Sequence, residues 1–264
     1  MKLKLLSSKL AVFVPLVAIG LIALPASADS TIYSDNFDGI GLSLNGSSVD
    51  VGNQNWQAGG AFLNNGAVNT VVGSAVGNAA FLPFNPVSGT VYTASATIVN
   101  PYGDWIGFGF FSALPVNGGD WTGTTFGQRH SNSGYAWLLD RNLAGQSDQQ
   151  AFLGYGTGNS IGAINGDLFD PSAPLTISIV LNTTTANWSA EFILNGNSQG
   201  VFSFPSADNP GIGGIGFSRT SNGTSGTGGT ISGFTLTQVP EPSALAFLGL
   251  SGLGTILFRR NKKS

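Results

Sequence analysis

Residues 29–239 alternate between apolar and polar positions in short runs, which Gly, Asn and Ser residues interrupt about every ten residues. The clearest run is TVYTASATIV (90–99), which places on one face Tyr92, Ala94, Ala96 and Ile98. A period of two is the spacing of a half-buried β-strand. No part of 29–239 keeps a helical period over three turns. The pattern therefore predicts strands joined by short turns.

Three further segments have the same period of two. The segment that follows Pro174 has on one face Leu175, Ile177, Ile179 and Leu181. In the next segment, NWSAEFILNGNSQGVFSF (187–204), the residues on one side are Trp188, Ala190, Phe192 and Leu194. Asn195-Gly196 is a typical hairpin turn within it. The last segment, GTISGFTLTQ (229–238), points Phe234 and Leu236 inward.

Many short strands in about 210 residues predict an all-β fold, an antiparallel β-sandwich or jelly roll. The chain has 39 Gly and 12 Pro in 264 residues, which leaves enough apolar positions for a packed core. A β-solenoid is the alternative for a chain rich in Gly, Asn and Thr. The best repeat candidates, at 51–53 and 76–78, do not recur. We therefore favour the sandwich.

Residues 1–28 have the order of a secretory signal peptide. Three lysines lie in the first nine positions, and an apolar run (10–24) leads to the small-residue site Ala26-Ser27-Ala28. Cleavage is expected between Ala28 and Asp29. An uncleaved anchor is the alternative, but 15 residues cover only about 22 Å of a ~30 Å hydrocarbon core. We expect export by Sec-type machinery and a sandwich domain over 29–238.

Residues 239–264 form a second terminal segment, with a motif (239–242), an apolar stretch (243–258) and a basic end (259–264). Two prolines within three residues predict an extended linker. The apolar stretch predicts a short helix that anchors the chain transiently in the inner membrane, because it is marginal in length. The basic end predicts a stop-transfer signal on the cytoplasmic side, made of Arg259, Arg260, Lys262 and Lys263.

The tail VPEPSALAFLGLSGLGTILFRRNKKS resembles a PEP-CTERM sorting signal. The resemblance rests on the triplet Pro240, Glu241 and Pro242, the short apolar helix and the basic terminus, in that order. It covers about 25 residues and implies processing by an exosortase of Gram-negative bacteria that make exopolysaccharide. It also implies release to the cell surface or display on it. The alternative is a plain C-terminal anchor with a Pro-rich linker.

The sandwich itself resembles, more loosely, the concanavalin A-like lectin, glucanase and laminin-G jelly rolls. The likeness is carried by Asp35-Asn36-Phe37-Asp38-Gly39 with Trp56 downstream, by the hairpin NWSAEFILNG and by the strand GFTLT. It implies a jelly roll whose last strand returns beside the first. Any link to carbohydrate that it suggests is an analogy of fold.

Charge and composition exclude several kinds of function. Residues 29–239 contain no lysine and have twelve acidic residues against three arginines, a net charge of −9. Such a surface repels phosphate backbones, so nucleic acid is excluded as a partner. The chain has no Cys and a single histidine, His130, and its two glutamates are Glu191 and Glu241. The paired carboxylates of a typical glycanase are missing. We predict a protein that is not an enzyme; the alternative is a secreted hydrolase with an unusual Asp-based site.

Calcium is the one cofactor that the residues suggest. Asp35 and Asp38 supply the oxygen ligands that this ion prefers, in an acidic domain that leaves the cell. The alternative is a turn in which Asp and Asn side chains cap their own backbone. No other cofactor is expected.

The segment 102–142 is the richest in residues that bind sugars, namely aromatic rings beside polar side chains. The candidate glycan-binding residues are Asp120, Trp121, Arg129 and His130. Three other tryptophans are assigned to the core: Trp105, Trp137 and Trp188. Packing within a loop is the alternative for Trp121, and a solvated loop position is the alternative for His130.

We expect an exported surface or matrix protein that contacts exopolysaccharide; a structural protein that acts through protein contacts is a further alternative.

Overall fold

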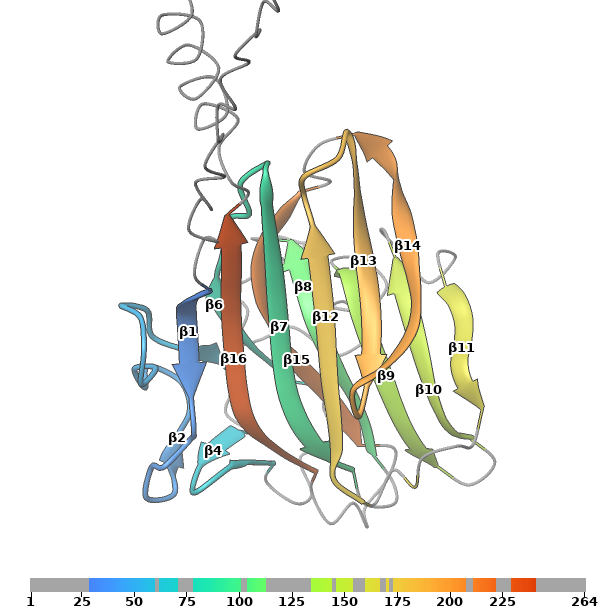
Figure 1. The fold of residues 1–264 in the computed structure, drawn as a ribbon. Helices are drawn as coiled ribbons and strands as arrows, with labels where there is room; N and C mark the ends of the chain where they lie inside the picture. Colours follow the sequence, from blue (N-terminus) through green and yellow to red (C-terminus); the bar gives the residue numbers. More distant parts are fainter. Residues whose placement is uncertain are drawn as a thin grey trace, which may run out of the picture. The chain divides into compact units, whose positions relative to one another are not determined.

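The fold is made of two antiparallel β-sheets that lie face to face (Figure 1). A computed structural model describes residues 29–59, 62–70, 78–100, 104–112, 134–143, 146–153, 160–166, 170, 173–207, 211–221 and 229–240. Residues Ser27–Pro242 form one compact unit. All elements in the described ranges are strands, and no helix there is long and apolar enough to span a membrane. The predicted all-β jelly-roll class is confirmed.

The nine-stranded sheet has the order β14-β13-β12-β7-β16-β5-β4-β2, with β1 paired to β16. Its strands are β14 (Asn197–Ala207), β13 (Asn187–Leu194), β12 (Leu175–Asn182), β7 (Thr90–Val99), β16 (Thr230–Pro240), β5 (Val68–Thr70), β4 (Phe62–Asn64), β2 (Leu42–Ser43) and β1 (Ser30–Asp35). The last strand thus returns beside the first, as the jelly-roll resemblance implies.

The seven-stranded sheet has the order β11-β10-β9-β8-β15-β6-β3. Its strands are β11 (Ser160–Gly166), β10 (Gln146–Leu153), β9 (Gly134–Leu143), β8 (Asp104–Ser112), β15 (Ile212–Ser221), β6 (Asn78–Pro83) and β3 (Gln57–Ala58). It lies behind the nine-stranded sheet in the view of Figure 1.

The period-two segments form the middle of the nine-stranded sheet, with the faces that the sequence predicts. Strand β7 spans the predicted run, and its even-numbered residues from Thr90 to Ile98 are buried while the odd-numbered ones are partly exposed. The apolar positions predicted in β12, β13 and β16 are likewise buried. Asn195 and Gly196 have φ of 47° and 79°, as a tight hairpin turn requires. These strands form one side of the core between the sheets.

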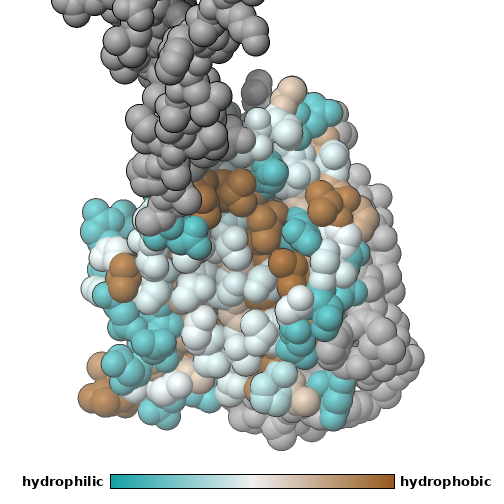
Figure 2. Space-filling view, viewed as in Figure 1, coloured by the Kyte–Doolittle hydropathy of each residue, from teal (hydrophilic) through white to brown (hydrophobic). Residues whose placement is uncertain are grey.

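The outer face of the nine-stranded sheet carries pairs of hydroxyl side chains between β7 and β12. Ser95 on β7 and Ser178 on β12 lie opposite each other with their Oγ atoms 2.7 Å apart. Thr97 and Thr176 form the next pair, with Oγ1 atoms 3.3 Å apart. Figure 2 shows this face as mainly neutral in hydropathy, with separate apolar patches. One face of this sheet is therefore solvated, as is common in antiparallel sheets.

The seven-stranded sheet is apolar on both faces. In β9, Leu138 points into the core between the sheets, whereas Trp137 and Leu139 belong to a second apolar cluster on the opposite face. The members of that cluster are at most 6% exposed: Ala79, Phe81, Phe111, Trp137, Leu139 and Phe152. The core positions predicted for Trp137 and Trp188 are confirmed, since they are 1% and 2% exposed. The side chain of Trp105 lies outside those that the structure describes.

Strand β16 continues beyond the predicted end of the domain at residue 238. Pro240 is its last residue and pairs with Thr90 of β7, so it lies in the strand and not in the linker that the sequence predicts. A proline is tolerated there because the end of a strand does not require its N–H in the ladder. The signal peptide and the C-terminal apolar helix lie outside the described residues.

Candidate functional site

The predicted glycan-binding residues Asp120, Trp121, Arg129 and His130 lie outside the described residues. The strands on either side of them are described. Strand β8 ends at Ser112, which pairs with Ile212 of β15, and β9 begins at Gly134, which pairs with Phe111. The segment 113–133 therefore connects two neighbouring strands at one end of the seven-stranded sheet.

Asp35, a predicted calcium ligand, points into the core. Its side chain is 2% exposed, although carboxylates are mostly found at the surface. The backbone N–H of Phe37 donates to Asp35 Oδ1 at 2.7 Å, and Trp56 Nε1 donates to Asp35 Oδ2 at 2.6 Å. Asp38, the second predicted ligand, is exposed. Through the bond from Phe37, the side chain of Asp35 caps its own backbone turn, which is the alternative to calcium binding that the sequence suggests.

The environment of Asp35 raises the pKa of its carboxyl group. Burial is the main cause, the bonds from Trp56 and Phe37 oppose it, and the charges of Asp50 and Asp38 add to it. Asp35 is 2% exposed and each of its oxygens accepts an N–H group, so a calcium ion does not reach this carboxylate in this conformation. The described residues contain no group of three or more acidic, His or Cys side chains that could hold a metal. Calcium binding stays a prediction.

A second buried carboxylate, Asp140 on β9, belongs to a polar group between the sheets. Gln149 Nε2 donates to Asp140 Oδ1 at 2.8 Å. Asn100, which follows β7, donates through Nδ2 to the Asp140 carbonyl at 3.0 Å and accepts a bond from Asn142 Nδ2 at 2.6 Å. These bonds join the two sheets through buried side chains. Asp140 has no exposed surface, so a substrate does not reach it in this conformation.

Two paired glycines, Gly216 on β15 and Gly109 on β8, leave a strip without side chains at the centre of the outer face of the seven-stranded sheet. One cross-strand row runs Phe81, Gly216, Gly109, Trp137 and Phe152. The rings of Trp137 and Phe152 are parallel and stacked, with centroids 3.9 Å apart. Aromatic rings beside a flat strip suit the apolar face of a sugar, but Trp137 and Phe152 stack on each other, are at most 6% exposed and do not line the open cavity described next. The aromatic side chains of this row therefore belong to the second apolar cluster, and we do not take the row as the candidate site.

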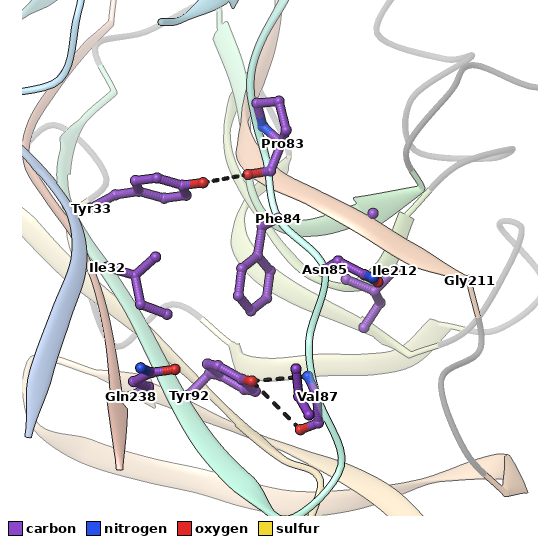
Figure 3. A pocket seen from close by; sticks show the side chains of 11 residues that line it. Ile32, Tyr33, Pro83, Phe84, Asn85, Val87, Tyr92, Gly211, Ile212 and Gln238 are labelled. Atoms are coloured by element: carbon purple, nitrogen blue, oxygen red, sulfur yellow. Dashed lines mark hydrogen bonds between the residues drawn. The ribbon is translucent and has the colours of Figure 1, made fainter. Parts of the chain in front are cut away.

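An open cavity of about 760 Å³ lies at one end of the sandwich (Figure 3). It is lined from the nine-stranded sheet by Ile32, Tyr33, Tyr92 and Gln238, and from the opposite side by Pro83, Phe84, Asn85, Val87, Gly211, Ile212 and Gly213. None of these residues is charged. Small-molecule sites commonly have volumes of about 300–1,000 Å³ and this mixture of aromatic and polar groups. We take this cavity as the candidate site.

Hydrogen bonds hold the aromatic walls of the cavity in place. Tyr33 on β1 donates its hydroxyl to the carbonyl of Pro83 at 2.7 Å, which joins the two sheets. The backbone N–H of Val87 donates to the hydroxyl of Tyr92 at 2.9 Å. Phe84 packs edge-on against Tyr92, with ring centroids 4.9 Å apart. Burial raises the pKa of Tyr33, so its phenol stays neutral and continues to donate.

Gln238 brings a free amide group into the cavity. It continues the inward series of β16 after Phe234 and Leu236, and it pairs with Tyr92 of β7. Its side chain makes no hydrogen bond within the described part of the chain, and neither does that of Asn85 at the cavity rim. The signal in the sequence was this polar residue at the end of an apolar series. Sequence reasoning missed the site because its lining comes from five separate segments.

Comparisons with known proteins agree with the fold and with the tail. Residues 238–263 match the PEP-CTERM protein-sorting motif. A search of curated proteins found no match. Among solved structures, the chain is similar to the carbohydrate recognition domain of Emp47p, with 18% identity and a TM-score of 0.52 over 81% of this chain and 98% of that one.

Two further structures have similar folds. One is the endo-1,3-β-glucanase of Streptomyces sioyaensis, with 14% identity and a TM-score of 0.54 over 82% of this chain and 99% of the enzyme. The other is the exoplasmic domain of VIP36 bound to Ca²⁺ and mannose, with 8% identity and a TM-score of 0.53 over 79% and 91%. At these identities the likeness defines the class of fold, a concanavalin A-like jelly roll. It does not decide between a lectin and an enzyme.

Proposed function

We propose that this chain is an exported, non-catalytic protein of the cell surface or extracellular matrix, sorted through its C-terminal tail, whose sandwich binds exopolysaccharide. The observation that carries the proposal is the sorting motif at 238–263 on a chain whose described domain is a lectin-like jelly roll. The signal peptide (1–28), the domain (29–238) and the tail (239–264) are the parts of this proposal that the sequence predicts.

An exosortase is the proposed partner of the tail, and it would act on Pro240, Glu241 and Pro242. Because β16 ends at Pro240, Glu241 and Pro242 are the better positions for a test. In the producing bacterium, Glu241→Ala with Pro242→Ala should keep the protein in the membrane fraction, while the unchanged protein reaches the surface or medium. Thr237→Val is the matched control, since Thr237 lies on the outer face of the same strand. Normal release of the double variant would refute the sorting role.

Binding of polysaccharide is the proposed activity of the domain. The contacts predicted from the sequence are Asp120, Trp121, Arg129 and His130. The test is a glycan array that includes the host exopolysaccharide, with the mature exported protein and its Trp121→Ala variant. Binding by the first and a clear loss in the second support these contacts. If the protein binds no polysaccharide, the structural, protein-binding alternative stands.

A hydrolase remains the competing function because one structural neighbour is a glucanase. The arrangement of Glu191 argues against it in this chain. Glu191 pairs with Val180 on β12 and with Val201 on β14, so no carboxylate lies directly across from it in either neighbouring strand. A glycosidase usually needs two carboxyl groups about 5–9 Å apart. Release of reducing sugar from a polysaccharide would contradict the non-catalytic proposal if Glu191→Gln, or the replacement of an aspartate of the domain by asparagine, abolished it.

A further inference from the structure

We infer that the cavity at the end of the sandwich is a binding site for a neutral saccharide of one or two rings, lined by residues other than the predicted contacts at 120–130. The inference rests on the proposed function, which places the exported protein among polysaccharides. Its chemistry comes from the cavity itself: a free amide, three aromatic rings and no charge, in a volume of about 760 Å³.

The lack of charge selects among ligands. A charged ligand would lose water on entering the cavity without meeting an opposite charge among the lining residues, which is costly. A fully apolar ligand would cover the amide of Gln238 and leave its donors and acceptor without partners, which is unfavourable. The cavity therefore suits a neutral molecule that has both apolar and hydrogen-bonding faces.

A saccharide ring has both faces. Its C–H groups pack against carbon surface, and here the parts of Tyr33, Phe84 and Tyr92 that stay exposed, 8%, 7% and 2% of each residue, line the cavity. The bonds described above hold these side chains in place (Figure 3). Its hydroxyls match the amide of Gln238, which offers two donors and one acceptor. Because the tyrosine walls are fixed before the ligand arrives, little ordering is required on binding.

The position of the cavity also favours a short ligand over a peptide. A bound peptide usually adds a strand to an open sheet edge or lies in a long groove. Most of the residues that line this cavity lie near strand ends or in the loops next to them, and only Ile32 and Tyr33 belong to β1, which pairs with β16. Strand β16 ends two residues after Gln238, so a saccharide held here would lie close to the start of the sorting tail.

The experiment measures binding of free sugars by saturation-transfer NMR and calorimetry, with the mature exported protein. The probes are glucose, galactose, mannose, N-acetylglucosamine, cellobiose and lactose, with glucuronic acid as a charged comparison. Two variants alter the cavity: Val87→Trp blocks the rim, and Gln238→Leu removes the amide while keeping its volume. Their matched controls are Val201→Trp, at a valine that is 63% exposed against 65% for Val87, and Thr237→Val.

The expected result is binding of at least one neutral sugar, weakened tenfold or more in both cavity variants and unchanged in both controls and in Trp121→Ala. Sugar binding that only Trp121→Ala weakens would overturn this inference and leave the proposed function standing. Absence of sugar binding would overturn it as well, and the glycan array then decides the proposed function alone. Binding of a synthetic peptide of residues 239–246, lost in Val87→Trp, would make the cavity a peptide site and also overturn it.

Discussion

The indole N–H of Trp56 donates to the carboxylate of Asp35 at 2.6 Å, and both side chains are buried, at 1% and 2% exposure. Trp56 also packs edge-on against Phe234 of β16, with ring centroids 5.1 Å apart. Asp35 is the last residue of β1 and pairs with the same Phe234. This one hydrogen bond therefore ties the loop that carries Trp56 to the place where the first and last strands meet.

Trp56→Phe should lower the stability of the protein through this bond. The variant leaves Asp35 Oδ2 buried without a donor, which costs about 1–3 kcal/mol beyond the apolar area that is lost. Trp188→Phe is the matched control, because Trp188 is also buried and its indole makes no hydrogen bond among the described residues. Urea unfolding measures both variants. An equal loss of unfolding free energy in the two would show that the Asp35 bond contributes nothing.

The raised pKa of Asp35 predicts a dependence of stability on pH. Between the ordinary carboxyl pKa of 3.8 and the raised value, the folded protein holds a proton that the unfolded chain has released. The contribution of Asp35 to the free energy of unfolding therefore falls as the pH rises through this window, and it is constant above it.

Asp35→Asn removes this titration. The unfolding free energy of the unchanged protein minus that of the variant should therefore fall as the pH rises through the window. Urea unfolding in half-unit steps from pH 3.5 to 7 measures it. Any change in hydrogen bonding to Trp56 or Phe37 adds an offset that does not vary with pH. The exposed Asp38 provides the control variant, Asp38→Asn. A difference that grows with pH would contradict the assigned direction.

The sequence predicts the nine-stranded sheet well because one face of it is solvated. Strand β7 has the predicted bounds, since its inward apolar and outward hydroxyl residues alternate without a break. The seven-stranded sheet has apolar residues on both faces, as in Phe110-Phe111 and Trp137-Leu138, so alternation of polarity does not mark its strands. Its pairing depends on contacts between distant segments.

The candidate site was less predictable for a related reason. Asp35 and Gln238 are polar residues at inward positions, and a pattern of polar and apolar residues assigns such side chains to the surface. Only the structure shows that Asp35 meets Trp56, 21 residues away, and that Gln238 faces a cavity. The two residues show that the polar positions inside a sandwich are set by tertiary contacts.

Gly109, at the centre of the seven-stranded sheet, should tolerate no side chain. Its φ is +152°, and a Cβ there would overlap the carbonyl oxygen of Ala136 and the backbone of Trp137 on β9. Gly109→Ala should therefore cost about 2–5 kcal/mol from strain and overpacking. Gly46→Ala is the control, since Gly46 has a φ of +84° with nothing within 4 Å, and it should cost only about 1 kcal/mol. Equal melting temperatures for the two variants would contradict the steric argument.

Calcium is expected to add no stability to the mature protein through the turn at Asp35 and Asp38, because Asp35 is 2% exposed and accepts an N–H group on each oxygen, which leaves Asp38 as the exposed ligand of the predicted pair. The measurement is thermal unfolding with 1 mM calcium and with a chelator. A site with a Kd of 10 µM would add about 2.7 kcal/mol and raise the midpoint by about 5–10 °C. A rise of that size that Asp38→Asn abolished would contradict the expectation and place the ion at the predicted turn. A rise that this variant left unchanged would place the ion at the residues outside the described ranges.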